Sequence, residues 1–168
     1  FINCDFHANL STNATGSTIS ACVWSNVTTR RWYFRGCSFR ENAVVDYGVE
    51  GGRAAVVFGS ATANNYAYFV DCTVQSNSIA TAQGTAAGKI GTILLDNSNS
   101  RLFAVGCVFK DNTLDVGEAA KAELKVDGPG WNGQVTLINT VLYDESDDYV
   151  PIVLNSATTP YLHNCYIS

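Results

Sequence analysis

The sequence predicts an all-β chain folded as a right-handed parallel β-helix, a solenoid of about five coils of 33–35 residues. Two observations predict it. A cysteine-centred motif recurs along the chain, and the segments around it are short, β-branched or aromatic, with Asn and Gly between them. The central residues of the motif, which we call the markers, are Cys4, Cys37, Cys72, Cys107, Thr140 and Cys165, at intervals of 33, 35, 35, 33 and 25 residues.

The residues around each marker follow one pattern. The residue before the marker is Asn, Gly or Asp, the types that most readily adopt a left-handed backbone conformation, which predicts a one-residue bend between two strands. The residue two positions after the marker is apolar in every copy. Because strand side chains alternate, the marker and this residue share one face, which we expect to point inward.

A second strand is predicted between successive motifs. The candidate ranges are 17–24, 53–58, 89–95, 122–126 and 151–155. Only 116–126 resembles a helix, and we interpret its end as strand. An antiparallel sandwich is the structural alternative, since short strands at regular spacing are also typical of that fold. The recurrence of like residues once per period favours stacking of coil on coil, about 4.8 Å apart.

Two ladders of identical side chains follow from this stacking. Cys4, Cys37, Cys72 and Cys107 are expected to stack inside, followed by Thr140 and Cys165, as mostly free thiols, because in-register stacking points their Cβ atoms the same way. Cys22 lies on the second strand, outside this ladder. Five residues after the markers stand Asn9, Asn42, Asn77 and Asn112, with Glu145 in the fifth copy. Their amides can bond to one another along the axis.

Length and charge exclude several function classes. The 168 residues suit a single β-helix segment, 1–168. The net charge of −5 argues against nucleic acid as a partner, which requires a basic surface. No apolar run approaches the roughly 20 residues of a membrane helix, so we expect no membrane insertion by this segment.

The motif also resembles known repeats. Phe39-Arg40-Glu41-Asn42, after an inward cysteine, resembles the FxxN motif of chlamydial polymorphic outer-membrane proteins. The segment 51–56, GGRAAV, is similar to their Gly-Gly-Ala-aliphatic motif with an arginine inserted. The layout also resembles pectin-lyase-like β-helix repeat proteins, over nearly the whole chain. The resemblance implies secreted or surface-displayed adhesins, structural spacers or polysaccharide-acting enzymes, and hence an extracellular or cell-surface location.

No catalytic constellation is visible in the sequence. Acid–base cleavage of a glycan needs two carboxylates within reach of one bond, and none recur at matched positions in neighbouring coils. The cluster Asp144, Glu145, Asp147 and Asp148 is a candidate calcium site through hard oxygen ligands, and otherwise a solvated loop. No other cofactor is expected. Three N-glycosylation sequons begin at Asn9, Asn13 and Asn26.

The expected function is a non-catalytic surface module, adhesin-like or structural, that presents loops to a glycan or protein partner. Trp131, in a turn-rich loop, and Tyr149 are the candidate ligand-binding aromatics, since exposed aromatic side chains suit sugar stacking and protein contacts. The alternative is a fragment of a polysaccharide lyase or hydrolase whose catalytic residues lie elsewhere. Because both ends of the sequence are apolar, further coils of the same protein are also expected as partners.

Overall fold

The computed structural model describes residues 1–13, 19–25, 30–46, 53–59, 65–81, 90–95, 100–115, 121–126, 134–143, 150–154 and 160–168. Within these ranges every regular element is a β-strand, and every pair of neighbouring strands is parallel. The predicted all-β class is therefore confirmed, and the antiparallel alternative is wrong. The described segments contain no helix with the length and apolarity to cross a membrane.

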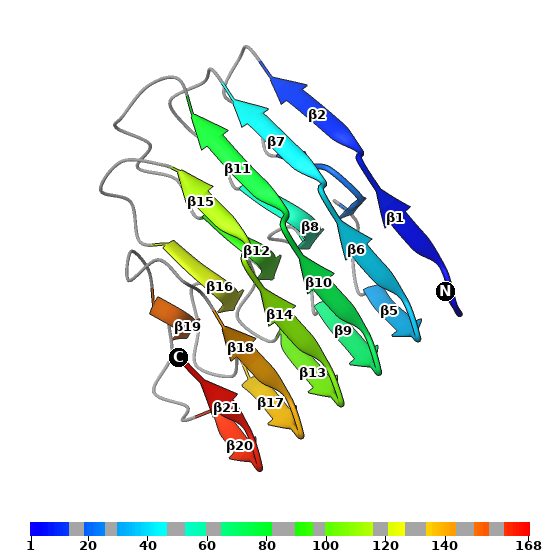
Figure 1. Ribbon diagram of the computed structural model, residues 1–168, viewed down its shortest axis with the longest axis vertical. Coiled ribbons are helices and arrows are strands. Elements are labelled where there is room, and N and C mark those ends of the chain that lie inside the picture. Colours follow the sequence, from blue (N-terminus) through cyan, green and yellow to red (C-terminus); the bar gives the residue numbers. More distant parts are fainter. Residues whose placement is uncertain are drawn as a thin grey trace.

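The strands form four parallel sheets, numbered by their order within one repeat, and Figure 1 shows the strands of sheets 2 and 3 side by side. Sheet 1 consists, in spatial order, of β5 (Arg30–Arg35), β9 (Asn65–Val70), β13 (Arg101–Val105), β17 (Gln134–Ile138) and β20 (Tyr161–His163). Sheet 2 consists of β1 (Asp5–His7), β6 (Ser38–Arg40), β10 (Thr73–Gln75), β14 (Val108–Lys110), β18 (Val141–Tyr143) and β21 (Tyr166–Ile167).

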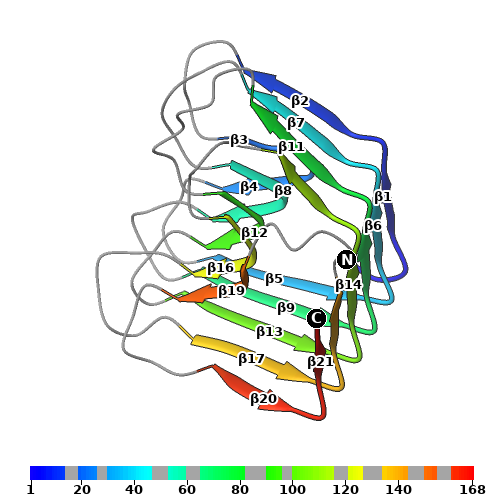
Figure 2. The same cartoon turned by 60° about the vertical axis from the view of Figure 1, so that its left-hand side comes forward.

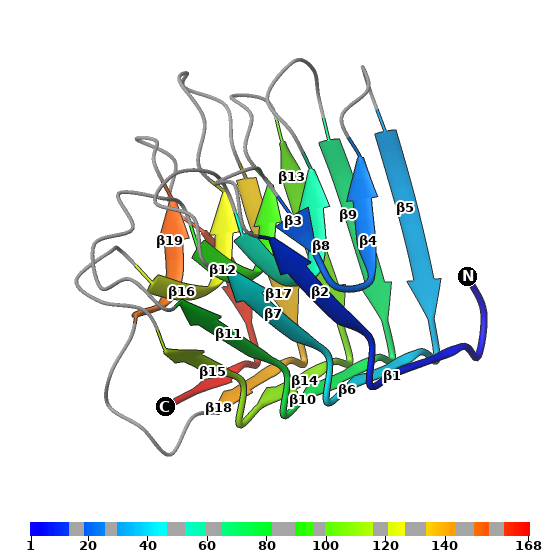
Figure 3. The same cartoon turned by 90° about the horizontal axis from the view of Figure 1, so that it is seen from above.

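Sheets 3 and 4 complete each repeat, and Figures 2 and 3 show them beside sheet 1. Sheet 3 consists of β2 (Leu10–Asn13), β7 (Ala43–Asp46), β11 (Ser78–Thr81) and β15 (Thr113–Asp115). Sheet 4 consists of β3 (Ile19–Ser20), β4 (Val23–Ser25), β8 (Arg53–Gly59), β12 (Ile90–Leu95), β16 (Lys121–Val126) and β19 (Val150–Leu154), with β3 and β4 both paired to β8. Strands that neighbour each other in a sheet thus come from successive repeats.

The chain passes from sheet 1 to sheet 2 over one residue with a left-handed backbone, as the sequence predicts. The φ values are 51° at Asn3, 58° at Gly36, 51° at Asp71, 63° at Gly106, 49° at Asn139 and 51° at Asn164. At Gly106 a larger residue would also approach a neighbouring side chain closely. A Cβ there would lie 2.5 Å from Oδ1 of Asp71, whose side chain covers Gly106 from the preceding repeat.

A second bend, between sheets 2 and 3, is not predicted by the sequence. It places Ala8, Glu41, Ser76 and Asp111 at φ values between 53° and 55°. These residue types share no preference for the left-handed region, so they give no common signal. The strands of sheet 3 that follow are three or four residues long and were missed for the same reason.

The core lies between the sheets and is filled by stacked inward side chains. Phe6 of β1 stacks on Phe39 of β6 with ring centroids 4.5 Å apart, and Phe34 of β5 stacks on Phe69 of β9 at 4.9 Å. The two rows meet edge to face, with 5.2 Å between the Phe34 and Phe39 centroids. Complete burial of a phenylalanine contributes about 1.5–3 kcal/mol, so these rows are a major part of the stability.

Strands β8 and β12 of sheet 4 are buried on both faces in their described part. Four consecutive residues of β8, from Ala54 to Val57, are fully buried, and so are Thr92 to Leu95 of β12. This continuous burial explains the unbroken apolar segments that predicted these strands.

The prediction of one strand over 17–24 is wrong, because the chain bends at Ala21 and Cys22 between β3 and β4. Ala21 and Cys22 lie opposite Ala55 and Val56 of β8, and the same two residues of β8 lie opposite the single residue Thr92 of β12.

We expect Gly106→Ala to lower the free energy of unfolding by about 1–2 kcal/mol, because a left-handed backbone with a Cβ costs that much. The measurement is urea denaturation of wild type, Gly106→Ala, Asp71→Ala and the double variant. In the double variant, removal of the Asp71 carboxyl should restore only the part of the unfolding free energy that is lost to the contact between the new Cβ and Oδ1 of Asp71. If Gly106→Ala is as stable as wild type, glycine is not required at this bend.

Candidate functional site

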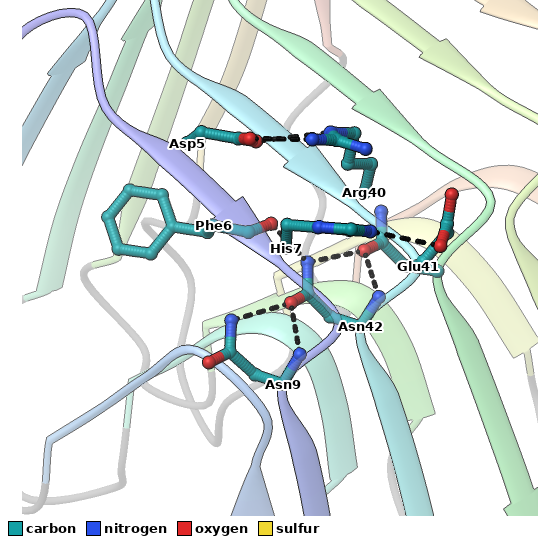
Figure 4. A network of polar contacts seen from close by, with 8 residues as sticks. Asp5, Phe6, His7, Asn9, Arg40, Glu41 and Asn42 are labelled. Carbon is teal, nitrogen blue, oxygen red and sulfur yellow. Dashed lines mark hydrogen bonds and ion pairs between the residues drawn. The ribbon is translucent and has the colours of Figure 1, made fainter.

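The four asparagines of the predicted ladder lie in one row across successive repeats, and Figure 4 shows the first two, Asn9 and Asn42. The Nδ2 group of Asn9 donates to Oδ1 of Asn42, that of Asn42 to Asn77, and that of Asn77 to Asn112, each over 2.8 Å. The same Oδ1 atoms accept from the backbone N–H groups of Asn9, Asn42 and Asn77 at 3.1, 3.0 and 2.9 Å. Asn42, Asn77 and Asn112 are buried.

The ladder satisfies backbone groups that the second bend leaves without a backbone partner. At the bend residue the ordinary pattern still holds, since the N–H of Glu41 donates to the carbonyl of Gln75. At the following residue, Asn42, the acceptor is the Asn77 side chain instead of a carbonyl. The second hydrogen of the Asn42 amide reaches back to the carbonyl of Phe6, over 2.9 Å. The amides of Asn42 and Asn77 therefore each link three successive repeats.

Polar pairs on the outer side of the same region are exposed. Arg40 donates two hydrogen bonds to the Asp5 carboxylate, at 2.7 and 3.2 Å, and His7 lies 3.0 Å from Glu41 (Figure 4). The hydrogen bond from Arg40 lowers the pKa of Asp5 below its usual value. Exposed pairs of this kind contribute little to stability, and we assign them no function.

The markers form a second ladder, in the predicted order. The N–H group one residue after each marker donates to the carbonyl of the preceding marker, for example Thr73 to Cys37 at 3.0 Å and Val108 to Cys72 at 3.0 Å. All six cysteines lie in the described residues and all are free thiols. Cys37, Cys72 and Cys107 are buried, whereas Cys4, Cys22 and Cys165 are partly exposed.

Each marker side chain donates to the carbonyl two residues before it, across the first bend. The sulfur-to-oxygen distances are 3.4 Å from Cys37 to Arg35, 3.3 Å from Cys72 to Val70 and 3.4 Å from Cys107 to Val105. The hydroxyl of Thr140 makes the same bond to Ile138, at 3.0 Å. What the marker position requires is a small side chain with a hydrogen-bond donor.

The thiols are poorly placed for chemistry. The hydrogen bond with Cys72, together with burial, raises the pKa of Cys107, and the same bond lowers the pKa of Cys72. Cys22, which lies beside Asn9 and the carbonyl of Ala55, has its pKa raised to about 12 by burial. Cys72 and Cys107 are each only 1% exposed, so no substrate reaches them. Both ladders are therefore structural.

The most unusual exposed surface is the outer side of sheet 1. Along β5 the side chains of Trp32 and Phe34 point inward and are buried, and those of Arg31, Tyr33 and Arg35 point outward. The parallel register aligns the outward residues of successive strands in rows. We call this surface the tyrosine–arginine face; it is formed by Arg31, Tyr33, Arg35, Tyr66, Tyr68, Arg101 and Phe103.

An aromatic row runs through the middle of this face. Tyr33 of β5, Tyr68 of β9 and Phe103 of β13 occupy the same register, four residues before successive markers. Their ring centroids are 4.5 Å and 5.0 Å apart, with interplanar angles of 5° and 7°. Because parallel rings at this distance cover one another, the row presents mainly ring edges and phenol hydroxyls to solvent. Partial burial raises the pKa of Tyr68, and the electrostatic interaction with the neighbouring Tyr33 raises it further. This phenol therefore stays protonated at neutral pH.

Arginines flank the aromatic row on both sides. Arg31 and Arg35 lie two residues before and after Tyr33 on β5, and Arg101 shares the register of Arg31 two strands away. All three are exposed. The guanidinium of Arg31 lies 5.4 Å from the ring centroid of Tyr66, a cation–π distance. The five strands of sheet 1 contain no Asp or Glu.

Several residues singled out in the sequence lie outside the described residues. These are the calcium candidates Asp144, Glu145, Asp147 and Asp148, the aromatics Trp131 and Tyr149, and the sequon residue Asn26. Among the described residues, no group of three or more His, Cys, Asp or Glu side chains is arranged to hold a metal ion. The tyrosine–arginine face was missed as a unit, although Tyr, Tyr, Phe, Thr and Tyr recur four residues before the last five markers. That recurrence is the signal that could have found it.

Comparisons with protein-family models, with curated proteins and with solved structures found no match to this chain.

We expect Asn77→Leu to lower the free energy of unfolding by about 1–3 kcal/mol, because it removes the acceptor of the buried Asn42 N–H and the side-chain donor to the carbonyl of Phe39. The measurement is denaturation in urea. Gln75→Leu is the matched control, since it makes the same kind of change at a partly exposed position of β10. Equal stability of the two variants would show that the ladder does not contribute.

The order in which the cysteine thiols of the folded protein are alkylated should follow their exposure. With iodoacetamide at neutral pH, Cys4 and Cys165 are expected to react well before Cys37, Cys72 and Cys107, because the thiolate must be both formed and accessible. Mass spectrometry of peptides after timed quenching measures the order. Rapid labelling of Cys72 in the folded protein would contradict the buried ladder, and so would the recovery of disulfides between markers.

Proposed function

We propose that the chain is a right-handed parallel β-helix that acts as a non-catalytic, extracellular or cell-surface module and binds a glycan or protein partner through the tyrosine–arginine face. The sequence alone favoured loops as the binding elements, with Trp131 and Tyr149 as candidates. The aromatic and arginine rows of sheet 1 now support a flat sheet surface as the better candidate.

The topology supports a β-helix. Each of the four sheets receives its strands from successive repeats, and the strands of one sheet are parallel and in register. A chain that visits the same sheets in the same order once per repeat advances by one strand spacing each time. Connections between parallel strands of one sheet are right-handed in almost all proteins, which supports that hand. The extracellular location is supported by the resemblance of the motif to repeats of secreted and surface-displayed proteins.

The residue composition of the tyrosine–arginine face is the observation that best supports the proposed binding function. Tyrosine and arginine are enriched among the residues that dominate binding energy at protein interfaces. Tyr33, at the end of the aromatic row, is 55% exposed, although the ring of Tyr68 stacks against one of its faces. The rigid sheet holds these side chains in place before binding, which reduces the entropy cost of association.

Substitution of Tyr33 and Tyr68 by alanine should weaken binding by about 2 kcal/mol or more, roughly 30-fold, because aromatic anchors contribute on this scale. The measurement is the binding of the full chain to glycan and extracellular-protein arrays, with confirmation of each positive partner by titration. Ser38→Ala with Thr73→Ala, on the outer side of sheet 2, is the matched control.

Thermal melts should show that both double variants remain folded. Equal binding of the two variants to every partner would exclude this face as the binding site. Cleavage of a polysaccharide by the wild-type chain would favour the alternative, a carbohydrate-active enzyme.

A further inference from the structure

The charge of the tyrosine–arginine face is opposite to that of the chain. The protein has 15 acidic and 10 basic residues, yet the strands of sheet 1 contain four arginines and no carboxylate. Arg31, Arg35 and Arg101 point outward, and none of the ion pairs among the described residues involves them. Three uncompensated guanidinium groups thus surround the aromatic row.

The aromatic row adds to this positive potential. A ring carries partial negative charge on its faces and partial positive charge on its edge. Since Tyr68 is covered on both faces, and Tyr33 and Phe103 on the face toward it, the row offers mainly ring edges and a neutral phenol donor at Tyr68. Both kinds of group favour an anionic ligand that can also accept hydrogen bonds.

We propose that the tyrosine–arginine face binds an extended, carboxylate-rich segment of a partner protein. This inference rests on the proposed function and names the chemistry of the partner. Carboxylates form bidentate hydrogen bonds with guanidinium groups, and the planar fork of arginine suits this geometry better than a lysine does.

The dimensions of the face match an extended peptide. Arg31 and Arg35 are four residues apart on one strand, which places them about 13 Å apart at 3.3 Å per residue. An extended peptide lying along β5 has the same rise, so acidic side chains four residues apart face both arginines. The side chain between them, two residues from each, then lies over the edge of Tyr33.

A glycan fits the face less well. Sugars bind aromatic side chains by stacking on ring faces, but in this row both faces of Tyr68 and one face each of Tyr33 and Phe103 are covered by a neighbouring ring. An acidic polysaccharide would retain contacts with the arginines but could not stack along the row. The observations therefore favour a peptide over an anionic glycan.

The test is fluorescence anisotropy with labelled decaglutamate, decaglutamine and an oligogalacturonate, each titrated with the full chain at about 20 mM and about 500 mM NaCl. We expect decaglutamate to bind at low salt, to bind more weakly at high salt, and to bind more tightly than the other two probes. Arg31→Gln with Arg101→Gln should raise its Kd on the order of tenfold or more, as loss of charge-assisted hydrogen bonds predicts.

Arg40→Gln is the matched control, since Arg40 lies on sheet 2 and is paired with Asp5. The inference is overturned if the control and the sheet 1 variant weaken decaglutamate equally, if decaglutamate does not bind, or if the oligogalacturonate binds more tightly. If decaglutamate fails while an array partner still depends on Tyr33 and Tyr68, only the partner chemistry is wrong. If no partner depends on them, the proposed function itself fails.

Discussion

The backbone N–H groups of Asn9, Asn42 and Asn77 fix the register of the first four repeats. The second bend turns the backbone at Glu41 and its equivalents, and the following N–H of Asn42 finds no carbonyl in the next repeat. The amide oxygen of Asn77 takes the place of that carbonyl. This works only when the next repeat presents an asparagine at the same height, so the interaction locks the register of neighbouring repeats as well as their separation.

The in-register stacking then determines what the surfaces look like. Because corresponding residues lie on top of one another, any side chain that recurs in the repeat becomes a row. Inside, this gives the stacked phenylalanines, and outside it gives the row of Tyr33, Tyr68 and Phe103. The tyrosine–arginine face is thus a consequence of the register, and its flatness and rigidity come from the same parallel hydrogen bonds that support the core.

The sequence predicted those parts of the fold that depend on a strong local preference. Gly36, Asp71 and Asn139 predict the first bend because these residue types tolerate positive φ. The apolar segments of β8 and β12 predict strands that are buried on both faces. The second bend was missed because Ala8 and Glu41 have no such preference and are held by their neighbours. The face was missed because outward residues are free to vary, and their alignment is visible only once the register is known.

Threonine in place of cysteine at one marker indicates that the marker position has a structural role and does not depend on thiol reactivity. Thr140 is buried and its hydroxyl donates to the carbonyl of Ile138, as the thiols of the other markers donate to theirs. Threonine shares size and donor capacity with cysteine, but it forms no disulfide and has no comparable nucleophilicity or affinity for soft metals. A position that accepts both residues is therefore one where packing and a donor suffice. The conspicuous cysteines of this sequence thus belong to the scaffold, and the binding surface that we propose consists of exposed residues on the outer side of sheet 1.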